Sequence, residues 1–303
     1  MTKKTNQEAL EEWQKFIQDL PETPFDRVRN GISTEELVRT GAKDEKDYYE
    51  HYASEKEFLA WYAMQQQKSY PKPSATVDLI ALRWNEKHQA VQVLLIQRKA
   101  RPYKDKWALP GGFIEERESI NDAVIRETKE ETGINLPKNQ PGHLPNVVRL
   151  PAVSSPYRDP RMWVITNPNI VLLNSEQAVN VTVGDDTEDA AWRDIKTTPK
   201  GQLVGFNDLA FDHQMILQTA IDYLIDDFDH RRLPLLTNLL SDHESLRQLI
   251  KVYSSINHNF DDYSTSNFSR VYHKYLTPTD YSDLQHHQRS DRGRPAKIYK
   301  LDI

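Results

Sequence analysis

Three glutamates, Glu127, Glu130 and Glu131, are spaced so that one helix would gather their carboxylates. They stand at positions i, i+3 and i+4 of a predicted helix that stops at Gly133, and such positions share one helix face. Three unneutralised carboxylates repel each other, whereas Mg²⁺ or Mn²⁺ prefers oxygen ligands and also bridges phosphate oxygens. The spacing therefore predicts a metal site on these residues. The alternative is a solvated acidic helix, which is what most glutamate runs are.

A longer pattern surrounds these glutamates. The segment GFIEERESINDAVIRETKEETGI fits G-x(5)-E-x(7)-R-E-U-x-E-E-x-G-U at every fixed letter, and only Thr128 stands where an aliphatic residue is commoner. A solvated face needs no glycine or arginine at fixed offsets, so the match favours a functional site. The matched residues are Gly112, Glu118, Arg126, Glu127, Glu130, Glu131 and Gly133.

Two features of this segment concern its loop. Arg126 lies about 100° around the helix from Glu127 and can pair with Glu118 to brace the loop, so we expect both members of this pair to be mainly structural. Gly111 and Gly112 would let the backbone approach a phosphate closely, and the alternative is that they are turn glycines.

The pattern resembles the catalytic motif of the Nudix hydrolase family, over a domain of about residues 75 to 200. The resemblance implies an α/β/α sandwich and hydrolysis of a diphosphate bond by a metal-activated water. It also implies that Glu127, Glu130 and Glu131 bind the metal and that Glu118 and Arg126 belong to the catalytic motif. One of the three glutamates, or a later acidic residue, takes the proton from water, and the sequence leaves this choice open. Candidates for a further carboxylate are Asp185, Asp186 and Glu188.

A second segment bears on the substrate. SSPYRDPRMWV contains an R-D-P-R sequence similar to one in Nudix members that hydrolyse ADP-ribose, which makes Arg158 and Arg161 candidate phosphate ligands. The alternative is a charged strand entry. Arg98, Gly111 and Gly112 complete the predicted substrate-binding set. We expect a nucleotide-type substrate, ADP-ribose or an ADP-sugar, that is cleaved to AMP and a sugar phosphate.

The C-terminal segments NDLAFDHQMIL, TSNFSRVYHKYL and RGRPAKIYKL resemble the winged-helix domain of NrtR-type Nudix-related transcriptional regulators. Residues 264–303 contain seven Lys and Arg and four Asp, so the net charge of this segment is positive, whereas that of the whole chain is negative. The resemblance implies that this region binds duplex DNA, through a helix in the major groove and an arginine-rich hairpin tip. A structural or protein-binding winged helix is the alternative. The candidate DNA contacts are Ser266, Asn267, Arg270, Arg289, Arg292 and Arg294.

These sites need elements to position them. We predict a helical N-terminal extension over residues 1–70, a Nudix domain over 71–205, and a connector helix with a winged helix-turn-helix domain over 206–303, which is an α+β chain. Short apolar runs on either side of NEKHQ predict a hairpin, and further strands are expected near NVVRLPAV, MWVITNPNIVLL and DAAWRDI.

Composition excludes several classes of protein. The 303 residues contain no cysteine, so disulfides and thiolate zinc sites are impossible, and the formal net charge is -6. No apolar stretch approaches the roughly 20 residues that span a bilayer. We therefore expect a cytoplasmic protein without a membrane partner, and we expect a homodimer. Two functions follow, a Nudix diphosphatase or an ADP-ribose-responsive DNA-binding regulator, and one chain can combine them.

Overall fold

The computed structural model describes residue 28 and residues 31–65, 72–136, 146–174, 187–230, 235–241, 243–282 and 297–301. The chain divides into two compact units, residues 1–72 and residues 73–303. Within the described ranges, no helix combines the length and the apolar character that crossing a membrane requires.

The described part of the first unit is helical, and its core is aromatic. Tyr49 stacks on Trp61 with ring centroids 5.1 Å apart, and both side chains are buried. The helical character expected of residues 1–70 is confirmed where the structure describes them, and residues 1–27 lie outside the described residues. The helices are α3 (Thr34–Thr40), α4 (Glu45–His51) and α5 (Glu55–Gln65).

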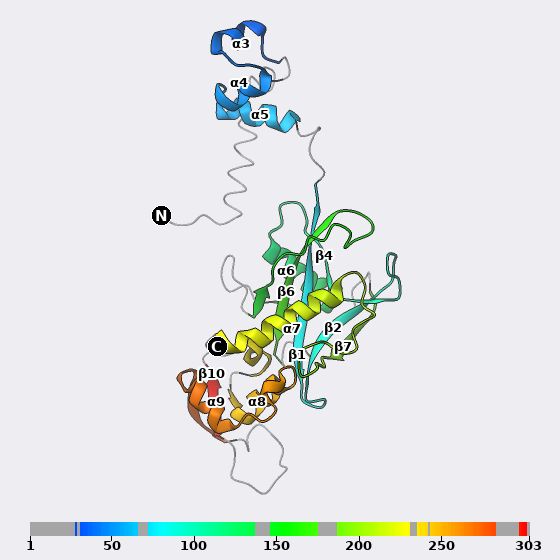
Figure 1. The fold of residues 1–303 in the computed structure, drawn as a ribbon, viewed down its shortest axis with the longest axis vertical. Helices are drawn as coiled ribbons and strands as arrows, with labels where there is room; N and C mark the ends of the chain where they lie inside the picture. Colours follow the sequence, from blue (N-terminus) through cyan, green and yellow to red (C-terminus); the bar gives the residue numbers. More distant parts are fainter. Residues whose placement is uncertain are drawn as a thin grey trace. The chain divides into compact units, whose positions relative to one another are not determined.

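In the described residues of the second unit, seven strands form one mixed sheet (Figure 1). Its order is β3-β2-β1-β6-β5, with β4 paired to β1 and β7 paired to β2. Strands β1 and β2 are antiparallel, with Leu82 opposite Val93, which confirms the expected hairpin. The strands are β1 (Ser74–Asn85), β2 (Ala90–Arg98), β3 (Trp107–Ala108), β4 (Gly111–Phe113), β5 (Val147–Arg149), β6 (Val164–Leu173) and β7 (Thr187–Asp194).

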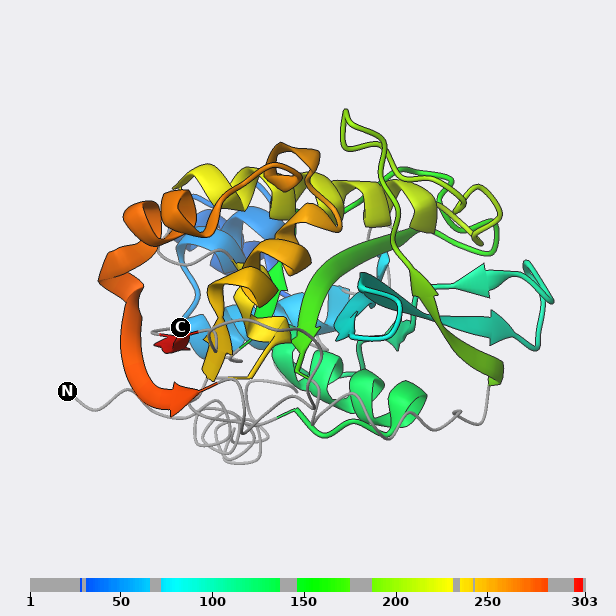
Figure 2. The ribbon, with the colours of Figure 1, turned by 90° about the horizontal axis from the view of Figure 1, so that it is seen from below.

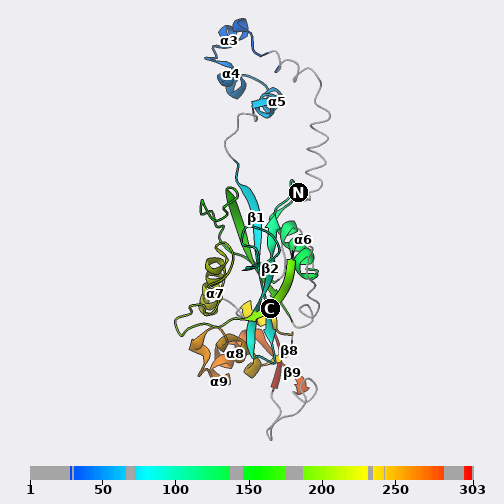
Figure 3. The same cartoon turned by 90° about the vertical axis from the view of Figure 1, so that its right-hand side faces the viewer.

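Helices cover both faces of this sheet (Figures 2 and 3). Because successive strand residues point to opposite faces, Leu79 of β1 packs with helix α6 (Ile120–Thr132) and Ile80 packs with helix α7 (His213–His230). A strand covered on both sides needs a near-continuous apolar run, and TVDLIAL supplies it. The expected mixed α and β fold is confirmed.

Helix α6 begins and ends where the sequence predicts. The Ser119 side chain accepts a hydrogen bond from the Asp122 backbone N–H at the first turn. At the other end Gly133 adopts a left-handed φ of 72°, and its N–H donates to the Lys129 carbonyl. Thr128 is buried and donates its hydroxyl to the Val124 carbonyl, so its polar group is satisfied against the sheet.

Helix α7 begins later than the pattern from Phe206 suggests. The residues before it form turns that are tied to β3, because Leu209 bridges Trp107 and the Ala210 N–H donates to the Trp107 carbonyl at 2.8 Å. The helix itself starts at His213. The expected long connector helix is therefore present, but it is shorter at its N-terminal end.

The remaining described residues form a small helical region with a three-stranded sheet in the order β8-β10-β9. Strands β9 and β10 are antiparallel, as expected for the late hairpin, and its turn lies outside the described residues. The short strand β8 was not predicted. The elements are η3 (Leu235–Leu239), β8 (His243–Ser245), α8 (Leu246–Ser254), η4 (His258–Phe260), α9 (Thr265–Tyr272), η5 (His273–Tyr275), β9 (Leu276–Ser282) and β10 (Lys297–Leu301).

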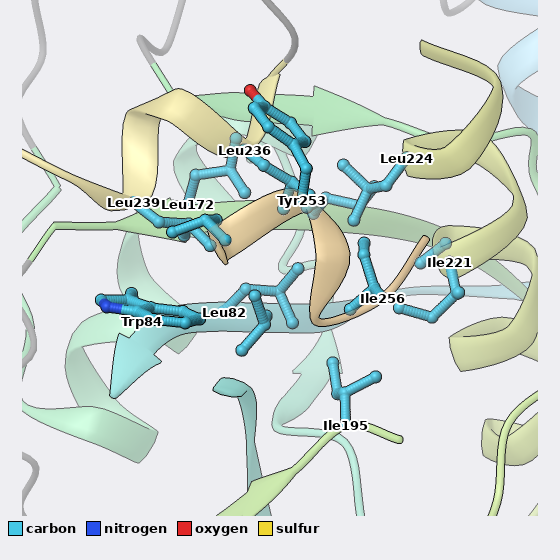
Figure 4. Packing of buried hydrophobic residues seen from close by; sticks show 14 of the residues in the cluster. Leu82, Trp84, Leu172, Ile195, Ile221, Leu224, Leu236, Leu239, Tyr253 and Ile256 are labelled. Atoms are coloured by element: carbon cyan, nitrogen blue, oxygen red, sulfur yellow. The ribbon is translucent and has the colours of Figure 1, made fainter. Parts of the chain in front are cut away.

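One buried cluster joins this C-terminal region to the large sheet. Figure 4 shows Tyr253 and Ile256 of the C-terminal region beside Leu82 of β1 and Leu224 of α7. Helix α7 supplies apolar residues to the same cluster along much of its length. The α7 side of the sheet and the C-terminal region therefore share one hydrophobic core.

Candidate active site

A cavity of about 320 Å³ opens beside the amino end of β1 and the start of the glutamate motif. Its walls come from β1, β2, β4, α6, the segment after β5 and the first turn of α7. It collects all five predicted substrate-binding residues and one glutamate of the motif. These lining residues are Arg98, Gly111, Gly112, Arg158, Arg161 and Glu131.

Arg126 organises the loop of the motif. Its Nε and Nη2 donate to the two oxygens of Glu118 at 2.8 and 2.9 Å, and Nη2 also donates to the Phe113 carbonyl at 2.9 Å. This is the ion pair that the sequence predicted. The pKa of Glu118 is lowered, mainly by the hydrogen bond from Arg126. A doubly hydrogen-bonded guanidinium fixes the loop against the helix.

Glu127 is held directly under the backbone of Gly112. Its side chain is buried, and its Oε1 accepts a hydrogen bond from Arg126 Nη1 at 2.7 Å. A Cβ atom at Gly112 would overlap the Glu127 carboxylate, so any larger residue there would force the Glu127 side chain to shift. Burial raises the pKa of Glu127, and the negative charges of Glu131 and Glu130 raise it further. The hydrogen bond and positive charge of Arg126 lower this pKa in part. The position therefore favours a neutralising cation.

The donor set suits a hard divalent ion, although it is not gathered around one point. In the parts of the chain that the structure describes, no three acidic or histidine side chains already form a group that could hold a metal. Glu130 bonds to Arg126 Nη1 at 3.0 Å, and its side chain is 59% exposed, so it can turn toward Glu127 without repacking the core. The oxygen donors of Glu127, Glu130 and Glu131 thus fit Mg²⁺ or Mn²⁺ once their side chains rotate.

Arg158 is built into the cavity wall between two carboxylates. Its Nε and Nη2 donate to Asp212 at 2.9 and 2.7 Å, and Nη2 also reaches Asp78 Oδ2 at 3.0 Å. Its side chain is only 5% exposed. Although burial opposes it, hydrogen bonding to Asp212 and Asp78 raises the pKa of Arg158. A phosphate would have to compete with both carboxylates for this guanidinium.

Arg161 and Arg98 are placed differently. The Arg161 side chain is 41% exposed, and its Nη2 pairs with the buried Asp159 at 2.7 Å. Arg98 lies over the Phe211 ring, 4.9 Å from its centroid, and donates from Nε to the Pro102 carbonyl. Arg161 is thus the more accessible of the two R-D-P-R arginines for a phosphate in the cavity.

The sequence did not predict several residues that line or support the wall of the cavity. Asp78, Phe211 and His213 line the cavity, and Asp212 holds Arg158. One signal was present, because Asp78 is a charged residue inside an apolar strand, and such a residue is seldom buried unless it is paired. Of the further acidic candidates, Asp185 and Asp186 lie outside the described residues, and Glu188 lies on β7.

The predicted DNA contacts divide between two segments. Ser266, Asn267 and Arg270 are exposed on α9, whose N-cap Ser264 accepts a hydrogen bond from the Asn267 N–H. The other three, Arg289, Arg292 and Arg294, lie outside the described residues.

Known proteins resemble this chain in sequence and in fold. A family model for the NUDIX domain matches residues 74–209. An ADP-ribose pyrophosphatase from Methanocaldococcus jannaschii is 38% identical over 156 residues, which cover 51% of this chain and 75% of that protein. The crystal structure of a MutT/nudix family protein from Enterococcus faecalis superimposes with a TM-score of 0.67 and 32% identity, covering 85% of this chain and 97% of that one. The chain belongs to the Nudix family.

A further relative aligns into the C-terminal region. The ADPR responsive transcriptional repressor NtrR from Acinetobacter baylyi is 28% identical over 256 residues, which cover 84% of this chain and 90% of that protein. The likeness of this chain to a regulator is therefore longer than its likeness to the pyrophosphatase, although the identity is lower.

Proposed function

We propose that this chain hydrolyses the diphosphate bond of ADP-ribose or a related ADP-sugar to AMP and a sugar phosphate. The observation that carries the proposal is the complete hydrogen-bond network of Arg126 with Glu118, Glu127 and Glu130, beside a cavity that contains Arg161. A degraded motif would have no reason to keep this network intact. The similarity to an ADP-ribose pyrophosphatase supports the choice of substrate.

Each group has a role in this proposal. Glu127, Glu130 and Glu131 hold the divalent metal, which would polarise the diphosphate and activate a water molecule. The ion pair of Arg126 and Glu118 holds the loop against the helix. Gly112 lets the backbone lie against the Glu127 carboxylate. Arg161 binds a phosphate oxygen at the open side of the cavity. One glutamate of the motif or a further acidic residue accepts the proton from water.

The test is turnover of ADP-ribose with Mg²⁺, beside NADH, nucleotide sugars and nucleoside triphosphates. We expect AMP release from ADP-ribose, reduced at least about 100-fold in Glu131→Gln because the variant loses an anionic metal ligand. Glu116→Gln is the matched control, since Glu116 lies in the same motif with a side chain that is 91% exposed. Equal turnover in the two variants would refute the assignment of the site.

A second candidate function is DNA binding that responds to ADP-ribose. The specific observation is the order of α8, α9, β9 and β10, two helices followed by a hairpin, which is typical of a winged helix. The named repressor relative, which aligns over most of this chain, supports the same proposal. In this proposal residues 71–205 form the Nudix domain and residues 206–303 form the connector helix and the winged-helix domain. The exposed Ser266, Asn267 and Arg270 of α9 face the DNA.

Fluorescence anisotropy with duplex DNA from upstream of the chain's own gene tests this candidate. We expect salt-dependent binding that ADP-ribose reverses, and weakening of about 10-fold in Arg270→Ala. Lys87→Ala is the control, because Lys87 is exposed in the turn between β1 and β2. Binding that is weaker than about micromolar at low salt would reject DNA recognition.

We also propose a homodimer. Val38 and Tyr62 of the first unit are 78% and 53% exposed, and a second copy would cover such side chains in the proposed dimer. Light scattering should give twice the mass of the chain, and a monomeric mass at micromolar concentration would contradict this proposal.

A further inference from the structure

The first residue of α7 and the two residues before it belong to the candidate active site, although they lie beyond the residues that the family model matches. That match ends at residue 209, whereas Phe211 and His213 line the cavity and Asp212 binds Arg158. The helix that leads to the C-terminal region therefore supplies part of the cavity wall.

His213 makes a buried hydrogen bond to the loop that precedes the motif. Its Nδ1 accepts from the Leu109 N–H at 2.9 Å, and both residues are buried. Because Nδ1 is the acceptor, the neutral ring carries its proton on Nε2, which lies 3.7 Å from Asp78 Oδ1. Burial lowers the pKa of His213, which keeps the ring neutral and the Nδ1 lone pair available.

The segment from Leu109 to Gly112 is held on two sides. On one side it follows β1, because the Leu79 N–H donates to the Pro110 carbonyl at 2.8 Å and Gly112 pairs with Val77. On the other side it depends on the start of α7, through His213. Since Gly112 lies against the Glu127 carboxylate, a shift of this segment would move that carboxylate.

We propose that His213 is a positioning residue of the active site, which fixes the Leu109 to Gly112 loop through its Nδ1 lone pair and so places Glu127. It need not touch the substrate. Its catalytic effect rests on the proposed hydrolase function, whereas its effect on the loop does not.

Two variants separate the acceptor from the bulk of the ring. His213→Asn keeps an oxygen near the position of Nδ1, whereas His213→Leu fills a similar space without an acceptor. We expect kcat to fall about 10- to 100-fold in His213→Leu with KM within about 3-fold, because a misplaced catalytic group costs rate more than binding. We expect His213→Asn to keep kcat within about 3-fold. Equal losses in both variants, or a change confined to KM, would overturn the proposal.

Nuclear magnetic resonance of the full chain gives a readout that does not need turnover. At neutral pH the His213 ring should show an unprotonated Nδ1 and a protonated Nε2. Amide signals of Leu109, Gly111 and Gly112 should shift in His213→Leu and stay near their wild-type positions in His213→Asn. A wild type that turns over no substrate would refute the hydrolase function alone. A ring that carries its proton on Nδ1 at neutral pH, or loop signals unchanged in His213→Leu, would refute the positioning role.

Discussion

At Gly112 one added methyl group would meet the Glu127 carboxylate. Gly112→Ala should therefore move Glu127 and lower kcat by at least about 10-fold, while the overpacked site costs about 1–3 kcal/mol in the free energy of unfolding. Steady-state kinetics and urea unfolding would measure both effects. Glu116→Gln is the control in the same motif, since that side chain is 91% exposed. Wild-type kinetics in Gly112→Ala would show that the close approach has no catalytic meaning.

The two arginines of the R-D-P-R segment should respond differently to mutation. Removing the Arg158 guanidinium leaves Asp78 and Asp212 facing each other in a buried wall, so Arg158→Met should lower the free energy of unfolding by about 3–5 kcal/mol. Arg161→Met keeps the hydrogen bond from the backbone N–H of residue 161 to Asp159, so it should lower the free energy of unfolding by less than Arg158→Met does and should weaken ADP-ribose binding. Calorimetry on both variants would decide, and the reverse pattern would contradict these roles.

The sequence predicted the site residues that lie inside one local pattern and missed those that distant segments bring together. Glu118 and Arg126 are only 8 residues apart within one sequence motif, so the motif was enough to pair them. Arg158 meets Asp78 across 80 residues and Asp212 across 54, and no local spacing encodes those contacts. The sequence could not show which of Arg158 and Arg161 is free to bind a phosphate, because that depends on the carboxylates that pair with each arginine.

Among the secondary-structure elements, helix α6 has a capping residue at each end, Ser119 and Gly133, and these caps fix where the helix begins and ends. Ser119 accepts from the Asp122 N–H at 3.2 Å, so Ser119→Ala should lower the free energy of unfolding by about 1 kcal/mol. Ser119→Asp should retain the stability, because a carboxylate caps a helix equally well. Thermal unfolding followed by circular dichroism would compare the variants. A stable Ser119→Ala protein would mean that sheet packing alone fixes the start of α6.

Elements were predictable to different degrees for physical reasons. The hairpin of β1 and β2 and the helix α6 were both predicted correctly, because their apolar residues follow a clear pattern and polar or glycine residues mark where they end. The start of α7 was placed too early, because the bridge from Leu209 to Trp107 overrides the local helical pattern. Strand β8 has three residues and exists through its pairing with β10, a contact that no local pattern signals.

At the scale of the second unit, His258 joins the C-terminal region to the loop after β7. Its Nδ1 contacts Asp261 Oδ2 at 2.9 Å and its Nε2 contacts the Thr197 carbonyl at 3.0 Å, while the Thr197 hydroxyl donates to the Ile256 carbonyl. With acceptors at both nitrogens, the charged ring satisfies both contacts. The hydrogen bond with Asp261 and then that with Thr197 raise the pKa of His258 above its ordinary value of 6.5.

This junction predicts a pH dependence of stability. A raised pKa in the folded state gives stability that is complete below the unfolded value and is lost as pH rises through the folded value. The free energy of unfolding of wild type should therefore fall relative to His258→Gln as pH rises from about 6 to 8. His273→Gln is the control, because exposed His273 contacts the Arg270 carbonyl of its own segment. Parallel curves for wild type and His258→Gln would contradict the role of His258.

The central claim is that the intact motif and the adjoining cavity act together as a diphosphatase. Its most direct test is incubation of the full chain with ADP-ribose and Mg²⁺ in water enriched in oxygen-18, with the products analysed by mass spectrometry. The account predicts AMP and ribose phosphate, with the heavy oxygen in the phosphate that the water attacked, and no products when the metal is chelated. Intact ADP-ribose, recovered from a preparation that binds it, would contradict the claim.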